Sequence, residues 1–147
     1  MCWVSQKMLD AWGNTQDELY KAAMENLARL ADGFDLAGTN TPRNELWPAN
    51  GYGFASSCLL LSPVRYLISQ TIGSPFRFGI PSRHRFYAWI DIDDEKYQIE
   101  KKAQMEREMD QMPYPLTSNI FEVDEKGQIK LVKPQPHVLP MPMTSSN

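Results

Sequence analysis

Two apolar runs that flank a basic turn restrict the fold of this chain more than any other feature. Residues 76–92 read FRFGIPSRHRFYAWIDI, with apolar side chains alternating on both sides of the turn. Such alternation is typical of β-strands, and two such runs predict an antiparallel hairpin. Placing the apolar side chains of both runs on one face requires Ile80 to lie opposite Phe86. The turn is therefore expected to span an odd number of residues, three to five, within 81–85.

The other face of this hairpin, together with its turn, forms the candidate binding surface. Its residues are Arg77, Arg83, His84, Arg85, Tyr87 and Trp89. A guanidinium group forms paired hydrogen bonds with carboxylates or phosphates and stacks on aromatic rings. Arg, Tyr and Trp also dominate binding hot spots. Two interpretations follow: the face contacts a partner, or a later acidic helix covers it and closes the domain.

Capping residues predict two helices in the first part of the chain. Ser5 caps a short helix, which Gly13 ends in the left-handed conformation. Thr15 and Glu18 form a capping box that opens a longer helix, and Gly33 ends it. The apolar positions of the longer helix repeat at helical spacing and predict one inward face. They are Leu19, Ala23, Leu27, Leu30 and Ala31.

The segment before the central hairpin combines an irregular connection with a third helix. Residues 34–53 are rich in Gly, Asn, Pro and Thr and read as a connection anchored by Trp47. Residues 54–61 are an apolar run that fits a buried strand or the lead-in to a helix. Ser62 as N-cap and Pro63 as the first helical residue open the third helix. Its expected inward residues are Val64, Leu67, Ile68 and Ile72.

A polar helix and a second hairpin follow the central one. Asp93 and Asp94 stand where a helix N-terminus favours negative charge, and the helix is expected over 95–111. A last hairpin is predicted over 119–132, with Gly127 at the positive-φ position of its turn.

This order of elements predicts an α+β fold, with a mainly antiparallel sheet of two hairpins packed with three to four helices. We expect a single domain over 1–133 and a proline-rich arm over 134–147. The 147 residues, 42% hydrophobic, can bury a core. Without a secretory signal, a membrane-length apolar run or a disulfide framework in its two cysteines, the chain is expected to be cytoplasmic and free of membrane contact.

The net charge of −3 is distributed unevenly. Residues 46–90 contain no Asp or Glu and four Arg, whereas residues 91–147 contain 11 acids and 7 bases. Four arginines without a lysine-rich stripe supply little positive charge for binding the phosphates of a nucleic acid, so the sequence does not favour nucleic-acid binding.

No strong catalytic motif occurs, and no cofactor is predicted. Weak metal candidates are Asp91, Asp93 and Asp94. Helix capping explains this acidic string without a metal, and Lys96 stands where a calcium loop requires glycine. Cys58, followed by three leucines, is expected to be a buried, inert thiol with a raised pKa. Ser82 beside His84 lacks an identifiable orienting acid.

Four blocks of the chain carry a resemblance to a known family. The blocks are LDAWGNTQDELYKAAMENLARL, YGFASSCLLLSPVRYL, PFRFGIPSRHRFYAWID and YPLTSNIFEVDEKGQI, which cover most of 8–130. They resemble the YtpQ-like group of uncharacterised bacterial proteins. The resemblance implies an α+β fold and a bacterial, cytoplasmic protein that is a shortened, C-terminal-like version of the group. Many members carry an acid at the position of His84, which weakens any role for this histidine. No activity is established for the group, so none is implied.

We therefore expect a small, non-catalytic protein-binding module of the adaptor, immunity or inhibitor type. It would contact another protein through the Arg and aromatic hairpin face. The alternative is an enzyme that acts on an anionic substrate, with arginines as clamps and an acidic or His group for the chemistry. Nucleic-acid binding ranks third, and the sequence does not determine the oligomeric state.

Overall fold

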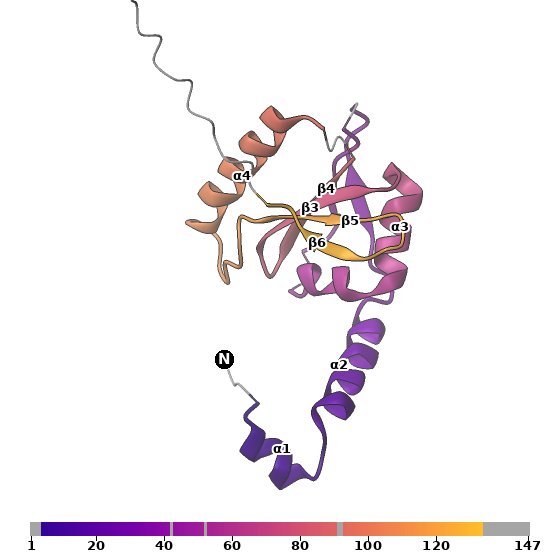
Figure 1. The fold of residues 1–147 in the computed structure, drawn as a ribbon, viewed down its shortest axis with the longest axis vertical. Coiled ribbons are helices and arrows are strands. Elements are labelled where there is room, and N and C mark those ends of the chain that lie inside the picture. The colour runs from indigo at the N-terminus through magenta and orange to yellow at the C-terminus, as the bar shows by residue number, and fades with distance from the viewer. Residues whose placement is uncertain (1–3, 42, 52, 91–92, 134–147) are drawn as a thin grey trace, which may run out of the picture.

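The structure is a computed structural model that describes residues 4–41, 43–51, 53–90 and 93–133. The predicted arm over 134–147 therefore lies outside the described residues. In the described part the chain forms five helices and a six-stranded antiparallel sheet, which confirms the predicted α+β fold (Figure 1). The helices are α1 (Gln6–Trp12), α2 (Gln16–Leu30), the 3-10 helix η1 (Ala55–Leu60), α3 (Ser62–Ile72) and α4 (Glu95–Met109).

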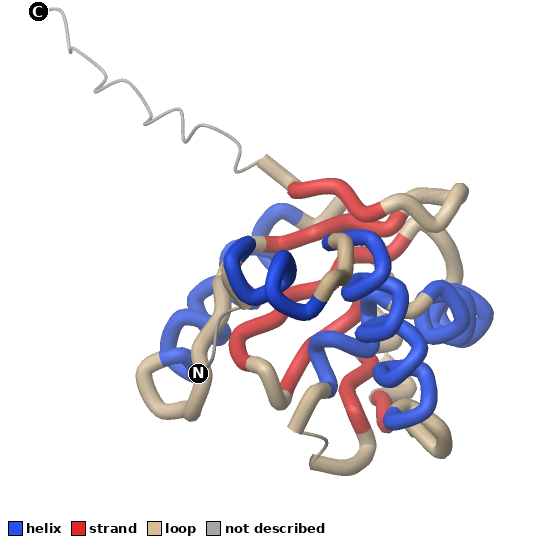
Figure 2. The backbone as a smooth tube through the Cα atoms, turned by 90° about the horizontal axis from the view of Figure 1, so that it is seen from below, coloured by secondary structure: helices blue, strands red, loops and turns tan. Residues whose placement is uncertain are grey.

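All neighbouring strands of the sheet pair antiparallel, in the order β1-β2-β4-β3-β5-β6. The strands are β1 (Leu36–Gly38), β2 (Leu46–Pro48), β3 (Phe76–Ser82), β4 (Arg85–Trp89), β5 (Ile120–Val123) and β6 (Ile129–Leu131). Figure 2 shows the strands side by side with helices around them. The central hairpin β3–β4 therefore holds the two halves of the sheet together.

The central hairpin has the predicted faces but a different turn. Phe78 lies opposite Ala88, which is the register that was expected from the apolar pattern. At the tip, however, Ser82 pairs with Arg85, so the turn contains two residues rather than an odd number. The register shifts between Gly79 and Ser82, as in a β-bulge. The bulge adds one residue to β3. The apolar side chains of both strands therefore still lie on one face, as a turn with an odd number of residues was expected to ensure.

Each face of the sheet carries its own core. One face packs under η1 and α3, with buried residues that include Phe76, Phe86 and Ile68. The other face carries Tyr87 and Trp89 and is covered by α4, on the opposite side of the strands from α3 (Figure 1). Helix α4 approaches β3 closely at Gly79, where an added Cβ would lie 2.2 Å from the sulfur of Met105. A larger residue at position 79 would therefore displace the end of the Met105 side chain.

The predicted connection over 34–53 contains two strands, so the prediction of irregular structure was wrong. Strand β2 joins the sheet where Leu46 pairs with Ala88, and β1 forms its edge. Strands of three residues are too short for alternation to be recognised. Trp47 is half-buried and packs against the second core, as an anchor would. The run 54–61 forms η1, the lead-in to α3.

Most helix boundaries follow the predicted caps. Ser5 accepts a hydrogen bond from the backbone N–H of Met8, and the capping box of Thr15 and Glu18 is complete. The N-cap of α3, however, is Leu61 and not Ser62, with Pro63 in the first turn. Helix α4 ends at Met109, two residues earlier than predicted, and Gly127 has a φ of +77°.

The predicted inward faces of α2 and α3 are only partly buried. Helix α2 has no buried residue. Three partly buried side chains pack against the core, Met24 and Leu27 of the helix and Ala31 at its C-cap. Leu30 is 58% exposed and Leu67 of α3 is 44% exposed, so both predictions were wrong. The helices α1 and α2 project from the sheet as an arm (Figure 1). Every helix in the described ranges is too short or too polar to cross a bilayer.

Candidate functional site

The aromatic half of the predicted binding surface is covered by α4. Tyr87 is 6% exposed and Trp89 is fully buried. The indole ring of Trp89 meets the ring of Tyr97, from α4, edge to face at 5.8 Å between centroids. Of the two interpretations from the sequence, the structure therefore supports the one in which the acidic helix covers this face.

A buried ion pair lies under α4 beside these rings. The ammonium group of Lys101, whose side chain is 6% exposed, lies 2.7 Å from a carboxylate oxygen of Glu45. It also donates to Gln104 and lies over the rings of Tyr87 and Tyr97, at 4.8 and 5.4 Å. The hydroxyl of Tyr97 donates to the same carboxylate of Glu45. The charge of Lys101 is therefore compensated by one carboxylate and two π faces.

The hydroxyl of Tyr87 connects this layer to the hairpin tip. It donates to the carboxylate of Glu108 at 2.8 Å and accepts a hydrogen bond from the guanidinium of Arg85 at 3.3 Å. Burial raises the pKa of Tyr87 to about 12, because the ionised phenolate would lose its hydration. Tyr87 is therefore a neutral donor over the physiological pH range.

We expect Tyr87 to be among the last of the six tyrosines to ionise when pH is raised. Its folded pKa lies above the unfolded value of about 10, so its stabilising contribution is complete below pH 10. That contribution is lost as the pH rises through about 12. Near-ultraviolet absorbance should show a late ionisation step that disappears in Tyr87→Phe. Ionisation of all tyrosines together near pH 10 would contradict this.

Two further predicted residues, Arg77 and Asp94, have structural partners. The guanidinium of Arg77 forms an ion pair with Glu122 of β5 at 3.3 Å. Asp94 caps α4 as predicted, and the hydrogen bonds from the backbone N–H of Tyr97 and from Arg43 lower its pKa. Asp93 is exposed, whereas Asp91 lies outside the described residues. Within the described residues no group of three or more His, Cys, Asp or Glu could hold a metal ion.

The two turn residues Arg83 and His84 contact a segment that follows α4. The guanidinium of Arg83 lies 3.9 Å above the ring of Tyr114, and the ring of His84 lies 5.6 Å from the same ring. Tyr114 is 51% exposed and Leu116 is 50% exposed. We name these five residues, Arg83, His84, Arg85, Tyr114 and Leu116, the hairpin tip. It is a small basic and aromatic surface.

Backbone hydrogen bonds hold the hairpin tip in place. The N–H of Arg83 donates to the carbonyl of Tyr114 at 3.1 Å, and the N–H of Leu116 donates to that of Pro81 at 3.0 Å. On the other side, the hydroxyl of buried Ser56 donates to the carbonyls of Ser82 and Arg85. The turn is therefore fixed from both sides.

Two nucleophiles considered from the sequence are enclosed. Ser82 is 1% exposed, and its hydroxyl oxygen accepts the backbone N–H of His84 rather than facing the imidazole as a nucleophile would. Cys58 is buried and free, and burial raises its pKa, as predicted. Neither group has the exposure that covalent catalysis requires.

Sequence reasoning missed Tyr114 and the pair of Lys101 and Glu45. Tyr114 has a φ of +55°, a conformation that non-glycine residues seldom adopt and that no local sequence signal announces. Lys101 and Glu45 are 56 positions apart, so their pairing depends on how α4 crosses the sheet. The sequence offered one signal for Lys101: it lies one helical turn from both Tyr97 and Met105, which places it on the same face of the helix as these two residues.

A groove of about 420 Å³ lies apart from this surface, between α3 and the turn from β5 to β6. Its lining includes charged residues of both signs, among them Arg65, Asp124 and Lys126. None of the residues predicted as a binding site lines it.

Comparison with known proteins gave no relative for this chain. A scan against protein-family models, a search of curated proteins and a search of solved structures each returned no match. Membership of the YtpQ-like group stays a prediction.

Proposed function

We propose that this chain is a small, cytoplasmic, non-catalytic module that binds another protein through the hairpin tip. The observation that carries the proposal is the stacking of Arg83 on Tyr114, two hot-spot residue types held together next to exposed Leu116. Because backbone hydrogen bonds already hold both residues, binding would cost little conformational entropy.

The chemistry of the tip favours an acidic segment of the partner. Arg83 lies in the two-residue turn and Arg85 directly follows it, in a stretch of 45 residues, 46–90, that contains no Asp or Glu. Guanidinium groups in this setting pair with carboxylates, and Tyr114 and Leu116 supply adjoining apolar contact. The hydroxyl of Tyr87 accepts a hydrogen bond from Arg85 of the tip, and the buried rings of Tyr87 and Trp89 would not touch the partner themselves.

Two further features of the tip agree with a binding role. Tyr114 keeps its positive φ although the conformation is unfavourable for a large side chain, and such residues concentrate at binding and active sites. In addition, Nε of Arg83 and Nε2 of His84 are buried without a hydrogen-bond partner among the described residues. Buried polar atoms are ordinarily paired, so the tip of the isolated chain is incompletely satisfied.

The test is affinity capture from a lysate followed by mass spectrometry. We expect the wild-type chain to retain a protein whose affinity falls by about 30-fold or more in Arg83→Ala with Tyr114→Ala, the effect of losing hot-spot residues. The control is Arg107→Ala, an exposed arginine in the last turn of α4, which should retain the protein. Circular dichroism should show all three chains folded. A partner retained equally by every variant would refute a role for the tip.

A further inference from the structure

Asn50 is the asparagine of this chain that precedes a glycine. The amide carbon of an asparagine side chain is an electrophile, and the backbone nitrogen of the next residue can attack it and close a five-membered succinimide ring. A side chain on the next residue obstructs this attack, and glycine has none. The other asparagines with a residue after them precede Thr, Leu, Glu or Ile: Asn14, Asn26, Asn40, Asn44 and Asn119. The sequence therefore singles out Asn50 and Gly51.

The structure leaves both reacting groups accessible. Asn50 and Gly51 are exposed and follow the end of β2, outside any helix or strand. Among the described residues, neither the side-chain amide of Asn50 nor the backbone N–H of Gly51 has a hydrogen-bond partner. A backbone that no hydrogen-bond ladder holds can turn its nitrogen toward the amide carbon. The pair therefore meets the conditions for ring closure.

The described part of the fold does not require glycine at position 51. Its φ lies outside the left-handed region, and an added Cβ would meet no described atom within 4 Å. At Gly73 and Gly79, by contrast, an added Cβ would lie 2.4 and 2.2 Å from a neighbouring side chain. A substitution at Gly51 therefore tests the chemistry of the pair without disturbing the packing.

We propose that Asn50 is a self-modification site, which the chain converts to aspartate and isoaspartate through a succinimide. The nitrogen of Gly51 forms a bond to the side-chain amide carbon of Asn50, and the bond from that carbon to the amide nitrogen breaks. The proton of the Gly51 N–H passes, by way of a base in the solvent, to the leaving ammonia. Water then opens the ring at either of its two carbonyl carbons, which gives aspartate or isoaspartate. The net reaction consumes one water and releases one ammonia.

The modification adds a negative charge near the hairpin tip. Strand β2 runs antiparallel to β4, so the chain that leaves β2 emerges at the end of the sheet where the hairpin turns. Further along, Gly53 lies against His84, since an added Cβ there would be 3.6 Å from Cε1 of the imidazole. Three residues of extended chain span at most about 11 Å, close to the Debye length at physiological ionic strength. A carboxylate at position 50 therefore reduces the positive potential of Arg83 and Arg85.

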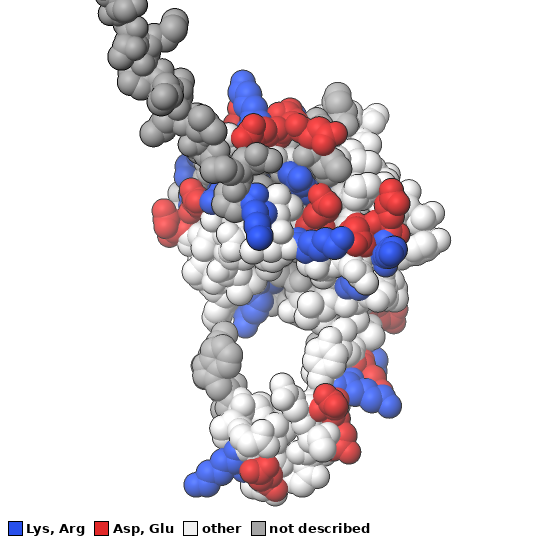
Figure 3. Space-filling view, in the orientation of Figure 1, with Lys and Arg blue, Asp and Glu red and all other residues white. Residues whose placement is uncertain are grey.

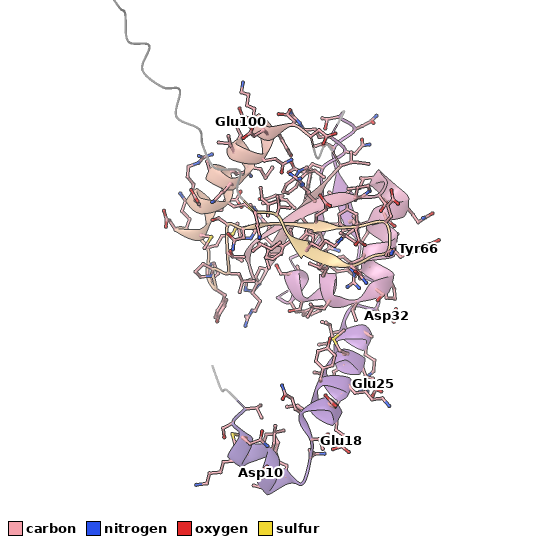
Figure 4. The ribbon with its side chains drawn as sticks, in the orientation of Figure 1. Asp10, Glu18, Glu25, Asp32, Tyr66 and Glu100 are labelled. Carbon is pink, nitrogen blue, oxygen red and sulfur yellow. The ribbon has the colours of Figure 1, made fainter. Side chains whose placement is uncertain are left out.

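Within residues 46–90 this charge is new, because the segment carries four Arg and no acid. Elsewhere acids are common: Figure 3 shows acidic and basic side chains interspersed over one face, and the acids labelled in Figure 4 lie on or next to α1 and α2, or on α4. Asp35, whose carbonyl accepts the backbone N–H of Ala49, already lies beside the segment, so the modification adds to its charge. We expect weaker binding of an acidic partner, an effect that rests on the proposed function.

Peptide mapping by mass spectrometry tests the site on the full chain, incubated at neutral and at mildly alkaline pH. Trypsin releases residues 44–65 as one peptide, in which Asn44 is an internal control. We expect the mass gain of an amide converted to an acid at Asn50, in two chromatographic peaks of equal mass, and none at Asn44. Gly51→Ala should slow the reaction by about tenfold or more, with an unchanged circular dichroism spectrum. An Asn50 that stays intact, or that reacts equally fast in Gly51→Ala, would overturn the proposal.

Affinity capture of the partner separates the modification from its effect on binding. Asn50→Asp carries the added charge, and Asn50→Gln is the neutral control, because its longer side chain would have to close a less favourable six-membered ring. We expect Asn50→Asp to bind the partner about two- to threefold more weakly at low salt, with a smaller difference at high salt. Equal binding by both variants would overturn the effect on the tip. A wild type that retains no protein would refute the proposed function but not the modification, whose readout is a mass.

Discussion

Replacement of Trp89 by alanine is expected to lower the free energy of unfolding by about 3–5 kcal/mol. The side chain is fully buried between β4 and α4, where its ring meets Tyr97. Its indole N–H has no hydrogen-bond partner among the described residues, so the loss is one of packing and of apolar burial. Trp89→Phe should therefore retain most of the stability, because an aromatic ring still fills the layer.

Urea denaturation followed by circular dichroism measures this effect, and Trp12→Ala is its matched control. Trp12 lies in α1 and is 53% exposed, so the same substitution there should change the stability by about 0.5 kcal/mol or less. If Trp89→Ala were as stable as Trp12→Ala, α4 would not cover this face in solution. The aromatic face would then be open to a partner, as the other interpretation of the sequence requires.

Replacement of Lys101 by methionine is expected to lower the free energy of unfolding by about 3 kcal/mol. This is the lower end of the range for removing one partner of a buried salt bridge. Methionine retains most of the length of the side chain but leaves the carboxylate of Glu45 without its cation, 18% exposed beneath α4. The partner substitution Glu45→Gln leaves an amide oxygen that still accepts the hydroxyl of Tyr97. The double variant should therefore recover much of the loss, because no unpaired charge remains.

A double-mutant cycle of the unfolding free energies separates the pair from its surroundings. Lys96→Met serves as the control, since the side chain of Lys96 on the same helix is 87% exposed and its salt bridge to Glu100 is on the surface. We expect this control to change stability by less than about 0.5 kcal/mol. Additive effects of Lys101→Met and Glu45→Gln would show that the two groups are not coupled.

The expected losses of stability in Trp89→Ala and Lys101→Met both require that α4 packs on the core. A partner can then contact only those hairpin residues that α4 does not cover. The residues predicted from the sequence then separate into two groups. Arg77, Tyr87 and Trp89 have partners within the fold, whereas Arg83, His84 and Arg85 form the hairpin tip with Tyr114 and Leu116.

Features set by neighbouring residues were determined by the sequence itself. Interactions within a few residues set the helix caps at Ser5, Thr15 and Asp94 and the turn at Gly127. The two-residue period of a strand sets the register of the central hairpin. The burial of Cys58 followed from its apolar neighbours. These interactions are short in range, so the local sequence is enough to predict them.

Features set by the crossing of distant elements were decided by the tertiary structure alone. The sequence allowed the Arg and aromatic face to be either exposed or covered, and the packing of α4 on the sheet decided that Tyr87 and Trp89 are covered. The same crossing joined Lys101 to Glu45, and the return of the chain after α4 placed Tyr114 on Arg83. A periodic apolar pattern indicates which face of a helix is to be buried, but it does not indicate which other element packs against that face. For this reason Leu30 and Leu67 were predicted inward, and the single chain leaves them exposed.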